Sequence, residues 1–77
     1  MDSKNRLIKL CNSVINGKYS SSEFMSYLET AIIEDERIQK LVDDIIYRLE
    51  LDVYSVFDEE QFCRRKKYAE AILDSIQ

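Results

Sequence analysis

The 77-residue sequence contains no histidine, no proline and no tryptophan, and only one glycine and two cysteines. Without histidine, the chain lacks the side chain that most often transfers protons or binds metal ions near neutral pH. Cys11 and Cys63 lie far apart and form no CxxC motif, so we expect reduced thiols, no metal site and no other cofactor. We therefore expect a protein that is not an enzyme, and we predict no catalytic residues.

Long apolar runs are also missing. The longest is Ala31-Ile32-Ile33, far below the roughly 20 residues that cross a membrane as a helix. Near the N-terminus, Lys9 and Asn12 interrupt any signal-peptide core. These features predict a cytoplasmic protein that does not act at a membrane.

Apolar residues recur at helical spacing in four segments, which predicts an all-α fold. The first segment covers about residues 3–16, and Gly17 suits the left-handed position that follows a helix. Ser20 and Glu23 form a capping-box pattern that opens a second helix, which we expect to end near Ile33. Asp35 is the expected N-cap of a third helix.

The third helix carries the clearest apolar stripe, from Ile38 to Leu49. We expect Asp58 to cap the fourth helix in a second capping box with Gln61, and this helix to run to about Ser75. Its expected apolar stripe comprises Phe62, Ala69, Ile72, Leu73 and Ile76. Short loops between the four helices predict a single domain over residues 1–77, an antiparallel four-helix bundle.

Asp52 fits this pattern badly. If the third helix continued past Glu50, Asp52 would turn toward the apolar stripe, and an unpaired buried carboxylate is costly. The helix is therefore expected either to end near Glu50 or to distort there. Asp52 would then be free to cap a short extra turn, packed by Val53, Val56 and Phe57.

The negative charge is concentrated in residues 34–60, which hold ten acidic and three basic residues, whereas the whole chain has a net charge of −4. On a helical wheel, Asp43, Tyr47 and Glu50 lie on one side with Glu36, and Tyr54 joins them if the helix continues. Tyrosine is common at protein interfaces, and carboxylates accept hydrogen bonds from arginine and lysine. This ridge favours binding of a basic protein, and solvated helix surface is the alternative.

Two further charged clusters have more than one interpretation. Asp58, Glu59 and Glu60 would bind the same partner, but acids in a first helical turn also complement the helix dipole. The run Arg64–Lys67 predicts solvated surface or pairing with the acids, with Arg64 and Lys67 pointing outward. Arg65 and Lys66 are expected to flank the apolar stripe. The alternative use of Arg64–Lys67 is DNA binding by a small helical regulator, and a helical adaptor is a third possibility.

Three stretches of the sequence resemble the colicin D-type immunity family of small bacterial self-protection proteins. The first runs from Leu7-Ile8-Lys9-Leu10-Cys11 through Asn16-Gly17-Lys18 to Ser20, Glu23 and Phe24. The second is Leu49-Glu50-Leu51-Asp52-Val53-Tyr54, and the third is Asp58-Glu59-Glu60-Gln61-Phe62 continuing to Arg64. The resemblance implies a four-helix protein that neutralises a tRNA-cleaving toxin by covering its basic cleft with acidic groups. Asp52 and Asp58 to Glu60 are the residues that match by position.

Together, the charge pattern and the resemblance predict an immunity protein whose partner is a cognate, cationic nuclease toxin domain. We expect a monomer or weak homodimer that does not bind nucleic acid directly. The predicted partner-binding residues are Asp43, Tyr47, Glu50, Asp52, Tyr54, Asp58, Glu59 and Glu60.

Overall fold

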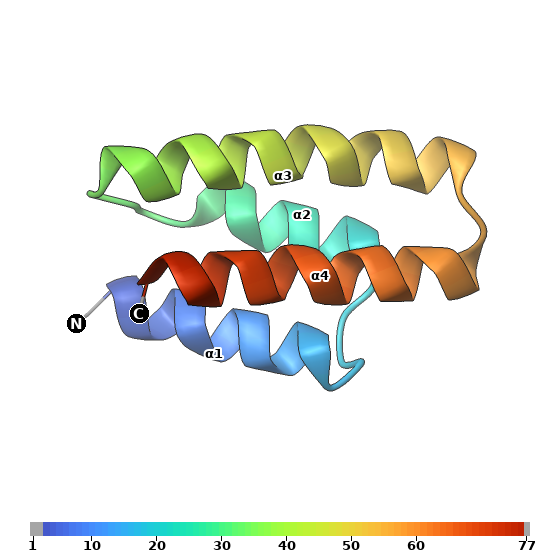
Figure 1. Ribbon diagram of the computed structural model, residues 1–77, viewed down its shortest axis with the longest axis horizontal. Coiled ribbons are helices and arrows are strands. Elements are labelled where there is room, and N and C mark those ends of the chain that lie inside the picture. Colours follow the sequence, from blue (N-terminus) through green and yellow to red (C-terminus); the bar gives the residue numbers. More distant parts are fainter. Residues whose placement is uncertain (1–2, 77) are drawn as a thin grey trace.

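Four α-helices account for most of the computed structural model, which describes residues 3–76. They are α1 (Ser3–Ile15), α2 (Ser21–Thr30), α3 (Glu36–Ser55) and α4 (Asp58–Ile76). No strand occurs in these described residues, which confirms the all-α prediction. In Figure 1, consecutive helices run in opposite directions, α1 packs beside α4, and α2 packs beside α3.

The two predicted helix starts in the first half of the chain are confirmed. The backbone N–H of Glu23 donates to Ser20 Oγ at 3.2 Å, and the N–H of Ser20 donates to Glu23 Oε1 at 3.0 Å, which completes the capping box. The carboxylate of Asp35 accepts from the backbone N–H groups of Arg37 and Ile38 at 2.9 and 3.4 Å. These local bonds fix where α2 and α3 begin.

Gly17 ends α1 as the sequence predicts. Its φ angle is +81°, and its N–H donates to the carbonyl of Val14 at 2.9 Å. The N–H of Lys18 donates to the carbonyl of Ser13, also at 2.9 Å. Only glycine adopts this left-handed conformation without strain, so the chain turns here toward α2.

Two predicted helix boundaries were wrong, the end of α2 and the start of α4. Helix α2 stops at Thr30 rather than near Ile33, because Ala31 is extended with ψ 137°. Asp58 is the first residue of α4 and not its N-cap, since the N–H of Gln61 donates to the carbonyl of Phe57 at 2.8 Å. The Gln61 side chain donates to the carbonyl of Val56 at 2.7 Å and makes no capping box with Asp58.

All four helices contribute to the core. Its fully buried members include Cys11, Val14, Phe24, Val42, Leu49, Ala69 and Ile72. Phe62 was predicted to belong to the apolar stripe of α4, but it is 37% exposed. The guanidinium carbon of Arg65 lies over the Phe62 ring, 5.4 Å from the ring centroid. No helix among residues 3–76 has the length and apolar character that crossing a membrane requires.

Candidate functional site

Asp52 lies inside a continuous helix. Helix α3 runs without interruption to Ser55, and the N–H of Val56 still donates to the carbonyl of Asp52 at 3.0 Å. Both sequence predictions, an end near Glu50 and a distortion there, are therefore wrong. As the continued helix requires, Asp52 turns inward and is only 4% exposed.

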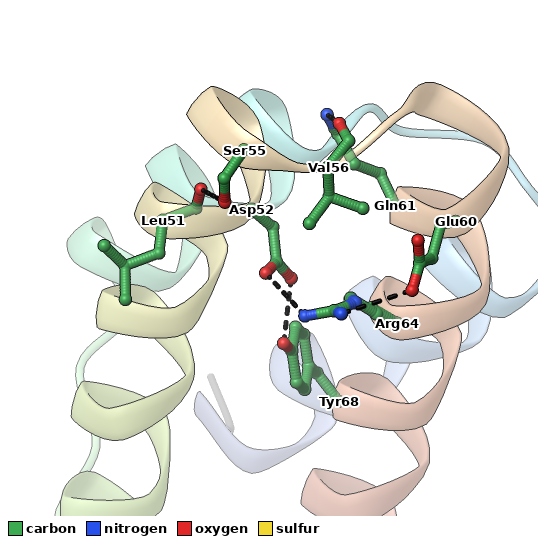
Figure 2. A network of polar contacts seen from close by, with 8 residues as sticks. All are labelled: Leu51, Asp52, Ser55, Val56, Glu60, Gln61, Arg64 and Tyr68. Atoms are coloured by element: carbon green, nitrogen blue, oxygen red, sulfur yellow. Dashed lines mark hydrogen bonds and ion pairs between the residues drawn. The ribbon is translucent and has the colours of Figure 1, made fainter.

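Helix α4 supplies the partners that allow this carboxylate to be buried (Figure 2). Arg64 Nη1 donates to Asp52 Oδ1 at 3.1 Å, and Tyr68 Oη donates to Asp52 Oδ2 at 2.8 Å. The same guanidinium donates through Nη2 to Glu60 Oε1 at 3.2 Å. Because each oxygen of Asp52 has a donor, the cost of an unpaired buried acid does not arise.

This network changes the role of two predicted residues. Asp52 is buried and paired within the chain, so it does not offer a carboxylate to a partner. Arg64, which was expected to point outward, instead bridges a buried acid and an exposed one. The sequence held a signal for this arrangement, since Arg64 and Tyr68 are four residues apart and share one face of α4.

The network also affects the titration of Tyr68. Burial raises the pKa of the Tyr68 phenol above its ordinary value of 10.0, and the hydrogen bond to Asp52 raises this pKa further, while Arg64 opposes the shift. A raised pKa in the folded state means that folding favours the protonated phenol. Its contribution to stability is therefore complete below pH 10 and is lost as the pH rises through the folded-state pKa.

We expect Tyr68→Phe to lower the free energy of unfolding by about 1–2 kcal/mol at pH 7, because Asp52 loses one donor. Above pH 10, the variant should lose less of its remaining stability than the native protein does. Urea unfolding at pH 7, 9 and 10.5 measures both effects. Tyr47→Phe, at a 61% exposed position, is the control. Stability curves of Tyr68→Phe and native protein that stay parallel above pH 10 would contradict this role.

Two other acids of α3 share an exposed face with two tyrosines. Asp43, Tyr47, Glu50 and Tyr54 are all exposed and are spaced by four, three and four residues, so they follow one side of the helix. Tyr54 joins this side because α3 continues. Leu51, four residues after Tyr47, is 49% exposed beside them and was not predicted. We call Asp43, Tyr47, Glu50, Leu51 and Tyr54 the acidic–aromatic face.

Asp58, Glu59 and Glu60 form the first turn of α4 and are exposed. Tyr54 and Asp58 are only four positions apart, which limits the distance between their Cα atoms to about 14 Å. The first turn of α4 therefore lies near the C-terminal end of the acidic–aromatic face. Glu60 differs from its two neighbours because it already holds Arg64.

The basic run of α4 is only partly available to a ligand. Arg64 is engaged by Asp52 and Glu60. Arg65 is half-buried, donates through Nη1 to Ser21 Oγ at 2.9 Å, and has its pKa lowered by burial. Lys66 and Lys67 are exposed, so the expectation that Lys66 flanks the core was wrong. Two of the four cations are thus committed to contacts within the chain.

The two cysteines have different environments. Cys11 is fully buried, and burial raises the pKa of its thiol to about 12, whereas Cys63 is exposed as its position off the apolar stripe predicts. Because the thiolate is the reactive form, Cys11 should be inert in the folded protein.

With a chromogenic disulfide reagent at pH 8, we expect one fast-reacting thiol in the folded chain and two after denaturation. Cys63→Ser should remove the fast reaction and leave the Cys11 thiol to react only on unfolding. Rapid reaction of both thiols in the folded protein would contradict the buried position of Cys11.

A groove of about 380 Å³ lies between α1 and α2, and none of the described residues that line it is acidic. Its lining includes Leu7, Lys9, Tyr19, Tyr27 and Ile32.

In the described part of the chain, no group of three or more histidine, cysteine, aspartate or glutamate side chains is arranged to hold a metal ion. No family model, curated protein or solved structure matches this chain.

Proposed function

We propose that this chain is an immunity protein that binds a cationic nuclease toxin domain and covers its basic active site with exposed acids. The observation that carries the proposal is the contrast between the buried Asp52 and the exposed acids Asp43 and Glu50. Asp52 is paired within the chain, whereas Asp43 and Glu50 stand exposed beside Tyr47 and Tyr54.

The residues of this face are exposed and lie outside the hydrophobic core. Large aromatic side chains at the surface are common where proteins bind one another, and Tyr54 is 85% exposed. Carboxylates around such rings attract a basic partner during association. The resemblance to the colicin D-type immunity family supplies the nature of that partner, a tRNA-cleaving domain with a basic cleft.

Three finer statements belong to the same proposal. We infer an antiparallel four-helix bundle, supported by the packing of α4 against both α1 and α3 and of α2 against α3. We place the protein in the cytoplasm, where a toxin that cleaves tRNA would meet its substrate. We also propose a monomer or weak homodimer, because an acidic face disfavours pairing with a second copy of itself.

The proposal is tested with the gene that precedes this one. If that gene encodes a large protein with a basic C-terminal domain, the purified domain should bind the chain with 1:1 stoichiometry in calorimetry. The affinity should fall as salt rises, because charge pairing contributes to the complex. Absence of a complex at micromolar concentrations, with both proteins folded, would count against this partner.

A DNA-binding regulator remains the competing function, and the structure gives it little support. Arg64 and Arg65 are committed to Asp52, Glu60 and Ser21, and the acids near the start of α4 would repel phosphates. A gel-shift assay with random duplex DNA at low salt separates the two functions. Salt-sensitive binding at micromolar protein would favour the regulator.

A further inference from the structure

The acidic–aromatic face exposes large hydrophobic side chains next to carboxylates. Tyr47 is 61% exposed, Leu51 49% and Tyr54 85%, at positions i, i+4 and i+7 of α3. The next aromatic residue along the chain, Phe57, is 89% exposed. Figure 2 shows that Leu51 points away from the Asp52 network, so that network does not explain its position.

Each tyrosine of this face has a carboxylate one helical turn away. Glu50 lies three residues after Tyr47 and four before Tyr54, and Asp43 lies four before Tyr47, so these side chains are neighbours on the helix surface. Among the described residues, the side-chain carboxylate of Glu50 makes no hydrogen bond or ion pair. Asp43 accepts one bond from Gln39 Nε2, at 2.8 Å on Oδ1.

Among residues 3–76, no arginine or lysine forms an ion pair with Asp43 or Glu50. Arg48 donates to Asp44 at 2.8 Å, on a neighbouring side of the helix. Lys40 is exposed one turn before Asp43, toward the N-terminal end of α3. The segment from Asp43 to Tyr54 therefore presents tyrosine rings beside two exposed carboxylates that are not in ion pairs with any described residue.

We propose that the acidic–aromatic face selects arginine over lysine in its partner; this inference rests on the proposed function and specifies its chemistry. A guanidinium group is planar, so it stacks on a tyrosine ring while donating paired hydrogen bonds to a carboxylate beside that ring. A lysine ammonium is compact and strongly hydrated, and it gains less from a ring. The occupant is thus an arginine-bearing segment of a basic protein, with an apolar side chain against Leu51.

A second copy of this chain is a poorer occupant. Pairing two copies through this face across a twofold axis would bring the carboxylates of one copy toward those of the other. Like charges placed opposite one another across an interface cost free energy and are used to exclude wrong partners. The charge of the face therefore favours a basic partner over self-association.

The inference is tested with hexa-arginine and hexa-lysine peptides, which have equal charge. Each is titrated into the isotope-labelled chain at 0.1 M salt while backbone amide signals are followed by NMR. We expect hexa-arginine to shift the amides of residues 43–57 and to bind about fivefold more tightly than hexa-lysine, because two rings each add a cation–π contact.

Two variants make the test specific. Tyr47→Ala combined with Tyr54→Ala should bring the ratio of the two affinities to about one while hexa-lysine binding persists. Tyr27→Ala, at a 50% exposed tyrosine of α2, should leave the ratio unchanged. Circular dichroism verifies that both variants remain folded.

Equal binding of the two peptides at residues 43–57 would overturn the arginine preference and leave an acidic protein-binding face intact. Peptide-induced shifts confined to other residues, or no shifts with either peptide, would overturn the assignment of this face. The complex with the basic nuclease domain is measured separately by calorimetry, so a failure of the proposed function is distinguishable from a failure of this inference.

Discussion

Replacing Asp52 by alanine is expected to lower the free energy of unfolding by about 2–3 kcal/mol, a large share of the total for a domain of this size. The buried carboxylate accepts from Arg64 and Tyr68, and its removal leaves the Tyr68 hydroxyl without its acceptor. Asp52→Lys should be worse and prevent folding, because it would place a second cation against Arg64. Urea unfolding followed by circular dichroism at pH 7 measures both changes.

Asp44→Ala is the matched control for this prediction. Asp44 is on the same helix and also pairs with an arginine, but its side chain is 54% exposed. Both substitutions gain the same helix propensity from alanine, so the difference between them reports the buried network. If the two variants unfolded at the same urea concentration, the Asp52 network would contribute nothing beyond a surface ion pair.

Reversing three exposed acids is expected to slow association with a basic partner by about 100-fold at low salt. The substitutions Asp43→Lys, Glu50→Lys and Glu59→Lys change the net charge from −4 to +2. Because these side chains are exposed, the fold should be retained. Stopped-flow or surface-based kinetics with the basic nuclease domain at 20 and 200 mM salt measure the effect.

A second triple variant separates the position of the charge from its amount. Glu29→Lys, Glu70→Lys and Asp74→Lys also give +2, but these exposed acids lie on α2 and α4, away from the acidic–aromatic face. This variant should associate more slowly than the native chain and much faster than the first variant. Equal rates for the two variants would mean that net charge alone attracts the partner, and that the face has no special role.

The fold could be predicted from local rules because these rules act within single helices. Three features show this: the bonds between Ser20 and Glu23, the bonds of Asp35 to the first turn of α3, and the left-handed turn at Gly17. Each involves residues no more than five positions apart. Helix ends without such a signal were predicted less well. Nothing near Ile33 marked the end of α2, and the cap of α4 falls on Phe57, an apolar residue that no capping rule selects.

The candidate site could be predicted only in part, for a related reason. The periodicity of α3 places Asp43, Tyr47 and Glu50 on one exposed face, and this much follows from the sequence. The environment of Asp52 does not, because its partners come from another helix, 12 and 16 residues later in the chain. Burial was predicted to be too costly for an unpaired acid, and the pairing with Arg64 and Tyr68 removes that objection.

The burial of Asp52 changes which substitutions test binding of the partner. Asp52 was predicted to bind the partner because of the proposed resemblance to the immunity family, yet a change there would act through folding. Asp43, Glu50 and Glu59 are exposed, so changes at these positions address the partner directly. Glu60 is intermediate, because its carboxylate also holds Arg64.

The central claim is that the exposed acids neutralise a basic nuclease, and titration of RNA cleavage tests it most directly. The basic C-terminal domain that the proposal expects the preceding gene to encode is incubated with total tRNA and increasing amounts of this chain. Cleavage is expected to stop at a 1:1 ratio with the native protein and to persist with the Asp43, Glu50 and Glu59 reversal variant. Cleavage that continued at a tenfold excess of the folded native chain would contradict the claim.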